Sequence, residues 1–171
     1  MSNEKGDTLR HTIAVLVDNE PGVLARVVGL FSGRGYNIES LTVAEVDHSL
    51  DRSRINIVTF GDEMIINQIR AQLERLVPVF NVVDLTVEGP SIERELALIK
   101  VVAQGENRIE ALRVADIFRA RAVDSTLGSF VFEVTGDSSK INAFIDLMRP
   151  LGLAEVSRTG VVAIARGAEA M

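Results

Sequence analysis

The order of hydrophobic patterns along the chain constrains its fold most, because the same order occurs twice. Over residues 9–89, runs typical of strands alternate with two amphipathic helical stretches in the order strand, helix, strand, strand, helix, strand. Residues 90–171 repeat this order, and Gly61-Asp62 corresponds to Gly136-Asp137. We therefore predict an α+β protein of two tandem ferredoxin-like domains, each βαββαβ. Chance similarity of amphipathic helices that follow a Gly-Asp turn is the alternative.

Each predicted domain should form a four-stranded antiparallel sheet with both helices on one face, because right-handed crossovers place them there. Apolar residues fall on both faces of strand 9–18, so the second domain, a partner sheet or a partner subunit must cover the other face. The predicted helices begin near Gly22 and Asp62 and span 107–120 and 138–149. The predicted strands are 9–18, 37–46, 53–60, 79–87, 96–103, 122–126, 129–135 and 155–165.

Composition excludes several partners. The chain has 171 residues, 47% of them hydrophobic, and a formal net charge of -6. Without any run of Lys or Arg, neither nucleic acid nor an anionic membrane is expected as a partner, since both need concentrated positive charge. No stretch has the length of a membrane span, and residues 1–8 are expected to form a flexible polar tail rather than a signal peptide, so we expect a cytoplasmic chain. The apolar content also favours an oligomer.

The sequence offers no constellation for catalysis or metal binding. It has no cysteine, and its two histidines have no nucleophile or second ligand near them in sequence. We interpret His11 as an edge or half-buried strand residue and His48 as solvated. The pair Glu93 and Glu95 is interpreted as a solvated face rather than an acid/base pair. A stand-alone enzyme using scattered carboxylates therefore has little support.

One turn is a candidate binding site. The strand that ends at Asp18 leads through Asn19 to Gly22, where a helix begins. Free backbone N–H groups and the positive end of the helix dipole attract a small anion. An ordinary helix start capped by Asn19 is the alternative. Asn37 and Ile38, at the start of the next strand, favour a binding site, because an amide could satisfy a ligand ammonium while Ile38 covers an aliphatic group.

These residues also carry a resemblance to a known family. The segment 18–24 and the segments 29–32 and 34–43 are similar to the first half of an ACT domain. The similarity is specifically to the small, regulatory subunit of acetolactate synthase (acetohydroxyacid synthase). Shorter and weaker matches extend it over nearly the whole chain, at 93–96, 118–120 and 157–161.

The resemblance implies a non-catalytic subunit that activates a thiamine-diphosphate-dependent catalytic subunit and confers feedback inhibition by valine in branched-chain amino acid biosynthesis. It implies a homodimer of side-by-side ACT sheets with valine or a related branched-chain amino acid at the interface. Thiamine diphosphate, Mg and FAD are then expected on the catalytic subunit and none on this chain. The implied effector-binding residues are Asn19, Gly22, Val23 and Leu24 of one chain and Asn37 and Ile38 of its neighbour.

In these terms, residues 9–89 are the ACT domain, for effector binding and dimerisation, and 90–171 are a C-terminal ferredoxin-like domain. The alternative with the same fold is an ACT-type amino-acid-binding module that serves a different enzyme or a transcriptional control system. Copurification with a partner other than a thiamine-dependent synthase would favour that alternative.

Overall fold

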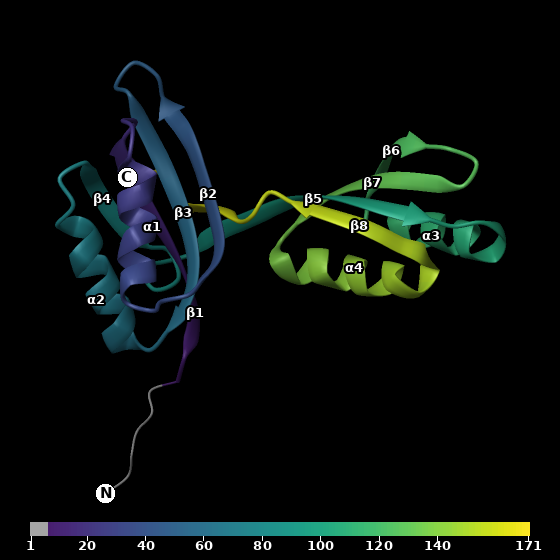
Figure 1. Cartoon of the computed structure of the whole chain (residues 1–171), viewed down its shortest axis with the longest axis horizontal. Helices are drawn as coiled ribbons and strands as arrows, with labels where there is room; N and C mark the ends of the chain where they lie inside the picture. Colours follow the sequence, from purple (N-terminus) through teal and green to yellow (C-terminus); the bar gives the residue numbers. More distant parts are fainter. Residues whose placement is uncertain (1–6) are drawn as a thin grey trace, which may run out of the picture. The chain divides into compact units, whose positions relative to one another are not determined.

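The computed structural model describes residues 7–171, so most of the predicted tail at residues 1–8 lies outside the described residues. The chain divides into two compact units. The first comprises the chain up to Ile92 together with Val162–Met171, and the second comprises Glu93–Val161. Each unit carries two helices on an antiparallel sheet, which confirms the predicted α+β class and the two ferredoxin-like domains (Figure 1).

The first unit is a four-stranded antiparallel sheet in the order β2-β3-β1-β4, with α1 and α2 on one face (Figure 1). Strand alternation directs Ile13, Val15 and Val17 of the central β1 toward the helices, where they are buried. The elements are β1 (Leu9–Asp18), α1 (Val23–Gly33), β2 (Ile38–Asp47), β3 (Arg52–Gly61), α2 (Glu63–Glu74) and β4 (Val79–Asp84).

The helix ends of this unit follow local signals in the sequence. Asp62 caps α2, since its Oδ1 accepts a hydrogen bond from the Ile65 amide at 2.9 Å. Gly35 ends α1 with φ 70°, and its amide donates to the Ser32 carbonyl oxygen at 3.3 Å. The cap at Asp62 confirms the predicted start of α2.

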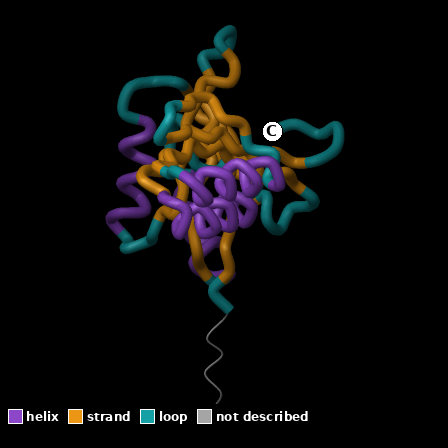
Figure 2. Tube along the Cα trace, turned by 90° about the vertical axis from the view of Figure 1, so that its right-hand side faces the viewer, coloured by secondary structure: helices purple, strands orange, loops and turns teal. Residues whose placement is uncertain are grey.

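The second unit repeats the arrangement with the sheet order β6-β7-β5-β8. In Figure 2, where helices are purple and strands orange, α3 and α4 run next to each other beside this sheet. Asp137 caps α4 as Asp62 caps α2, accepting from the Lys140 amide at 2.8 Å. The elements are β5 (Ser91–Val102), α3 (Gly105–Ile117), β6 (Arg121–Ser125), β7 (Ser129–Gly136), α4 (Ser138–Gly152) and β8 (Leu153–Arg158).

The last predicted strand, 155–165, is divided in the structure. β8 pairs with β5, and a separate β9 (Val162–Ala165) follows after Gly160, whose φ of 89° interrupts the extended backbone. The residues from Val162 onward belong to the first unit, although we assigned all of 90–171 to the C-terminal domain. The sequence pattern missed this because the break depends on the conformation of one glycine.

These last residues cover part of the outer face of the first sheet. Ala163 is buried with Ala14 and Leu85, and Met171 packs against the same cluster. The Arg54 guanidinium donates a hydrogen bond to the Ala163 carbonyl oxygen at 2.8 Å. The cover that the apolar outer residues of β1 require is thus supplied in part by the chain's own C-terminal segment.

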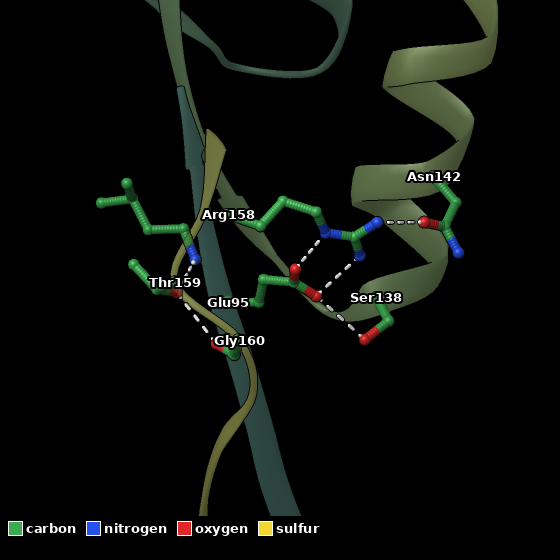
Figure 3. A network of polar contacts seen from close by, with 7 residues as sticks. Glu95, Ser138, Asn142, Arg158, Thr159 and Gly160 are labelled. Carbon is green, nitrogen blue, oxygen red and sulfur yellow. Dashed lines mark hydrogen bonds and ion pairs between the residues drawn. The ribbon is translucent and has the colours of Figure 1, made fainter. Parts of the chain in front are cut away.

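One buried polar cluster lies in the second unit (Figure 3). Glu95 of β5 is only 3% exposed, and its carboxylate accepts hydrogen bonds from Arg158 of β8 and from Ser138 Oγ of α4. Arg158 also donates to Asn142 Oδ1 at 2.8 Å. Our interpretation of Glu95 as a solvated residue was wrong, because strand alternation places it on the same face as the buried Ala97.

Candidate functional site

The β1–α1 turn is fixed by backbone hydrogen bonds to two other loops. The Asn19 amide donates to the Asp51 carbonyl oxygen at 2.8 Å, in the turn between β2 and β3. The Asp18 amide donates to the Pro78 carbonyl oxygen at 2.9 Å, just before β4. The turn is therefore held in one conformation while its own residues, from Asn19 to Gly22, are exposed.

The start of α1 has the features of an anion-binding helix terminus. Gly22 occupies the N-cap position in the left-handed conformation, with φ 86°, and no side chain caps the helix. The first turn of α1 contains no acidic residue. The alternative of an ordinary start capped by Asn19 does not describe this turn. The Val23 amide donates to the Glu20 carbonyl oxygen at 3.4 Å, so the amides of Leu24 and Ala25 and the helix dipole remain available to an anion.

Val23 and Leu24 have different environments, although we predicted both as effector-binding residues. The Val23 side chain is 4% exposed and belongs to the core of the first unit, whereas Leu24 is 40% exposed. The Val23 amide donates to the Glu20 carbonyl oxygen at 3.4 Å, so Val23 shapes the turn through its backbone and its side chain packs in the core. Leu24 can offer its side chain as an apolar contact beside the helix start.

Asn37 and Ile38 lie at the opposite end of α1 from Asn19. The helix has 11 residues, so its ends are about 16 Å apart at 1.5 Å per residue. The strand register agrees, because Ile38 pairs with Thr59 at one end of β3, while Asp18 pairs with Arg52 at the other. The structure therefore brings Asn19, Gly22 and Leu24 together but does not bring Asn37 or Ile38 to them within one chain.

β2 connects these two ends of the domain and has a free edge within residues 7–171, since its only partner in the sheet is β3. It is ten residues long, and its apolar side chains Val43 and Val46 are exposed. A long apolar edge strand is a template for pairing with another chain. This edge is thus suited to an interface.

Side-chain hydrogen bonds order the β2–β3 turn that holds Asn19. The Asp47 carboxylate accepts from the Ser49 hydroxyl at 2.7 Å and from the Leu50 amide at 3.1 Å. These bonds, the Ser49 hydroxyl first, lower the pKa of Asp47. His48 in the same turn is solvated as predicted, and its hydrogen bond to Glu45 raises its pKa.

Sequence reasoning missed one polar pair in the first unit. His11 is buried, and its Nδ1 lies 2.8 Å from Oδ2 of the buried Asp84. Strand alternation could have placed His11 on the helix face with Ile13, but nothing local indicates a partner so distant in sequence.

Within residues 7–171 there is no cluster of three or more His, Cys, Asp or Glu side chains that could hold a metal ion. No helix among these residues has the length and hydropathy to cross a membrane.

The β2-β3-β1-β4 sheet with two helices on one face, an uncapped α1 start at Gly22 and a free β2 edge define an ACT-domain protein. Comparison with known families agrees: residues 13–81 match the AHAS small subunit-like ACT domain, and residues 94–167 match a family described as the small subunit of acetolactate synthase. The chain belongs to the family of acetolactate synthase small subunits.

Relatives of known name support this membership over the whole chain. A probable acetolactate synthase small subunit of Archaeoglobus fulgidus is 52% identical over 93% of this chain and 98% of its own length. The acetolactate synthase isozyme 3 small subunit of Escherichia coli is 44% identical over 95% and 99%. The crystal structure of the small subunit from Thermotoga maritima has a TM-score of 0.84 and 38% identity, covering 94% of this chain and 99% of that one. The predicted family and its non-catalytic, ACT-domain character are confirmed.

Proposed function

We propose that this chain is the regulatory subunit of an acetolactate synthase, which activates the catalytic subunit and confers feedback inhibition by valine. One observation supports the proposal above the others. The two halves of the implied effector site, Asn19 with Gly22 and Asn37 with Ile38, lie at opposite ends of one domain whose β2 edge is free. A site divided in this way is complete only when a second copy joins it.

Antiparallel pairing of two β2 edges about a two-fold axis would complete the site. It places the Ile38 end of one strand beside the Asp47 end of the other, because antiparallel partners run in opposite directions. The Asp47 end leads into Asp51, whose carbonyl oxygen holds Asn19. Asn37 of one protomer therefore approaches Asn19 of its partner, and two equivalent sites form in each homodimer.

The groups in such a site match the parts of valine. The uncapped amides at the start of α1 can bind the carboxylate. The side-chain oxygens of Asn19 and Asn37 can accept hydrogen bonds from the ammonium group, and Leu24 and Ile38 can contact the isopropyl group.

The expected affinity follows from these contacts. The helix dipole contributes about 0.3 to 2 kcal/mol and apolar burial about 1.5 to 3 kcal/mol. With hydrogen bonds to the amides, about 4 to 6 kcal/mol is reached, which corresponds to millimolar to tens-of-micromolar affinity. Leucine and isoleucine differ by one methylene, so selectivity of about 1 to 3 kcal/mol is expected.

Regulation then requires no catalytic group on this chain. An effector that contacts two protomers binds their paired arrangement better than a shifted one, and it biases the assembly by that difference in affinity. Thiamine diphosphate, Mg and FAD would be held by the catalytic subunit, where the reaction takes place.

Mixed dimers of two single variants test the divided site. Asn19→Ala and Asn37→Ala should each abolish valine binding in calorimetry, because every site of a variant homodimer lacks one amide. In a mixed dimer, one site combines the intact Asn19 of one chain with the intact Asn37 of the other. Each mixed dimer should therefore bind valine at one of its two sites, so random exchange of an equimolar mixture should restore about a quarter of all valine sites and part of the valine inhibition of the synthase. No restoration after verified subunit exchange would contradict the divided site.

Gly22→Asp provides a second test of the anion position. Nothing lies within 4 Å of a Cβ at Gly22, but its φ of 86° makes any other residue strained by about 1 to 2 kcal/mol. The added carboxylate would compete with that of valine, so the variant should stimulate the synthase normally and resist valine. Gly22→Ala, which has the same strain without the charge, is the matched control. Recovery of a different protein on copurification would instead support a module of another system.

A further inference from the structure

A shallow, open groove lies between α1 and α2, which pack side by side on the first sheet (Figure 1). One wall is formed by α1 from Arg26 to its C-cap residue, Arg34. The other is formed by Gln72 near the end of α2 and by Arg75, which follows it. The groove is separate from the β2 edge and from the exposed turn at Asn19, and the proposed effector site does not use it.

Three arginines line the groove without an ionic partner. Arg26, Arg34 and Arg75 are exposed, and no carboxylate in the described part of the chain forms an ion pair with them. Other arginines of the same chain do have such partners, as Arg70 does in Glu88 at 2.8 Å. Arg34 and Arg75 lie at helix C-termini, where a cation is favourable in its own right, but Arg26 lies inside α1. The groove therefore concentrates positive charge on a chain whose net charge is -6.

Two glycines form part of the same surface of α1. Gly29 and Gly33 are one helical turn apart, and nothing lies within 4 Å of a Cβ built on either. Neither has a positive φ, so neither packing nor backbone conformation within the chain requires glycine there. Glycine destabilises a helix interior relative to alanine. Gly33 is the last residue of α1, but Gly29 lies inside the helix, and its presence there is explained if another backbone approaches α1 closely.

One polar atom in the groove lacks a partner. Gln72 Oε1 is buried and accepts no hydrogen bond from any residue between 7 and 171. A buried acceptor without a donor is unfavourable, and rotation of the half-buried Gln72 side chain toward a bound chain would give it one. Leu30 and Leu76, both half-buried, add apolar contact area beside it.

We infer that this groove docks an acidic segment of the synthase catalytic subunit, with its carboxylates on Arg26, Arg34 and Arg75 and its backbone against Gly29 and Gly33. The inference rests on the proposed function and names the surface through which the subunit acts. A second copy of this chain is disfavoured as the occupant, because a two-fold contact would set arginine against arginine. A free anion would use the arginines but leaves the glycine surface unexplained.

Neutralisation of the three arginines tests the charge. The variant Arg26→Gln/Arg34→Gln/Arg75→Gln should raise the chain concentration needed for half-maximal stimulation of the catalytic subunit at least tenfold. It should also reduce the dependence of that concentration on salt, since charge-assisted contacts are lost. Valine binding to the isolated variant should stay within about threefold of wild type, which shows that the ACT fold is intact. Arg119→Gln, at an exposed arginine of the second unit, should change none of these values.

Gly29→Leu tests the close approach independently of charge. The open space around Gly29 and the higher helix propensity of leucine should raise the thermal unfolding midpoint, while the added side chain blocks the groove and raises the half-maximal concentration at least tenfold. If the wild-type chain does not bind the catalytic subunit at all, the proposed function and this inference both fail. If the wild-type chain binds but both groove variants bind equally well within twofold, only this inference is wrong. This inference is also wrong if the variants alter only the self-association of the chain.

Discussion

Arg158 donates hydrogen bonds to both carboxylate oxygens of the buried Glu95 and thereby links β8 to β5. Because Glu95 is 3% exposed and the Arg158 side chain 34%, removing the arginine leaves a nearly buried carboxylate without its counter-charge. We expect Arg158→Met to lower the free energy of unfolding of the second unit by about 3 kcal/mol, as found when one partner of a buried pair is removed. Urea denaturation of the full chain measures this loss.

An exposed ion pair on the opposite face of the same two strands is the matched control. Lys100 and Glu155 are 2.9 Å apart, but their side chains are 46% and 67% exposed. Lys100→Met should therefore change the free energy of unfolding by less than about 1 kcal/mol. Equal losses in the two variants would show that burial of Glu95 does not determine the strength of its ion pair.

Gly152 allows α4 to meet β8 with no space for a side chain. Its φ is 114°, and a Cβ built on it would lie 2.0 Å from the backbone oxygen of Val102. Gly152→Ala should cost at least about 3 kcal/mol in the free energy of unfolding, because backbone rather than a flexible side chain must move. Gly35→Ala, with φ 70° but open space, should cost only the conformational strain of about 1 to 2 kcal/mol. Thermal unfolding of the two variants side by side makes the comparison.

The features that the sequence predicted well are those that local chemistry determines. The starts of α2 after Asp62 and of α4 at Ser138 each depend on a few neighbouring residues, because the carboxylates of Asp62 and Asp137 accept hydrogen bonds from amides in the following turn. Element order and the tandem domains follow from the same local periodicities. The family resemblance supplied the assignment of the turn at Asn19 to an effector site, which stays a prediction.

What the sequence missed depends on contacts between distant residues. The burial of Glu95 requires Arg158, which is 63 positions away, and that of His11 requires Asp84, which is 73 away. Residues 162–171 belong to the first unit because of contacts between residues that are far apart in sequence. Hydrophobic periodicity does not indicate such contacts. The different environments of Val23 and Leu24 were also missed, because both fit an apolar helix start.

The β2–β3 turn gives a prediction for pH. A hydrogen bond from His48 to Glu45, at 2.9 Å, raises the pKa of His48, so protonated His48 stabilises the folded turn. This stabilisation is complete below the ordinary histidine pKa of 6.5 and is lost as the pH rises through the higher folded-state value. Glu45→Gln should lower the pKa of His48 toward 6.5, measured by an NMR titration of the imidazole protons. Asp51→Asn, which removes a weaker Coulombic influence, should shift it less.

Val23 and Leu24 should separate stability from effector binding. The buried Val23 packs in the core of the first unit, so Val23→Ala should lower the free energy of unfolding by about 1 to 2 kcal/mol. Valine affinity should be preserved in this variant, because the Val23 side chain packs in the core and not beside the exposed turn. Leu24→Ala, at an exposed position, should change the free energy of unfolding by less than about 0.5 kcal/mol but weaken valine binding at least fivefold, because an apolar contact with the isopropyl group is lost. Denaturation gives the free energy of unfolding of both variants, and calorimetry gives their affinity for valine. A loss of affinity in Val23→Ala without a loss in Leu24→Ala would show that the effector does not lie beside the start of α1.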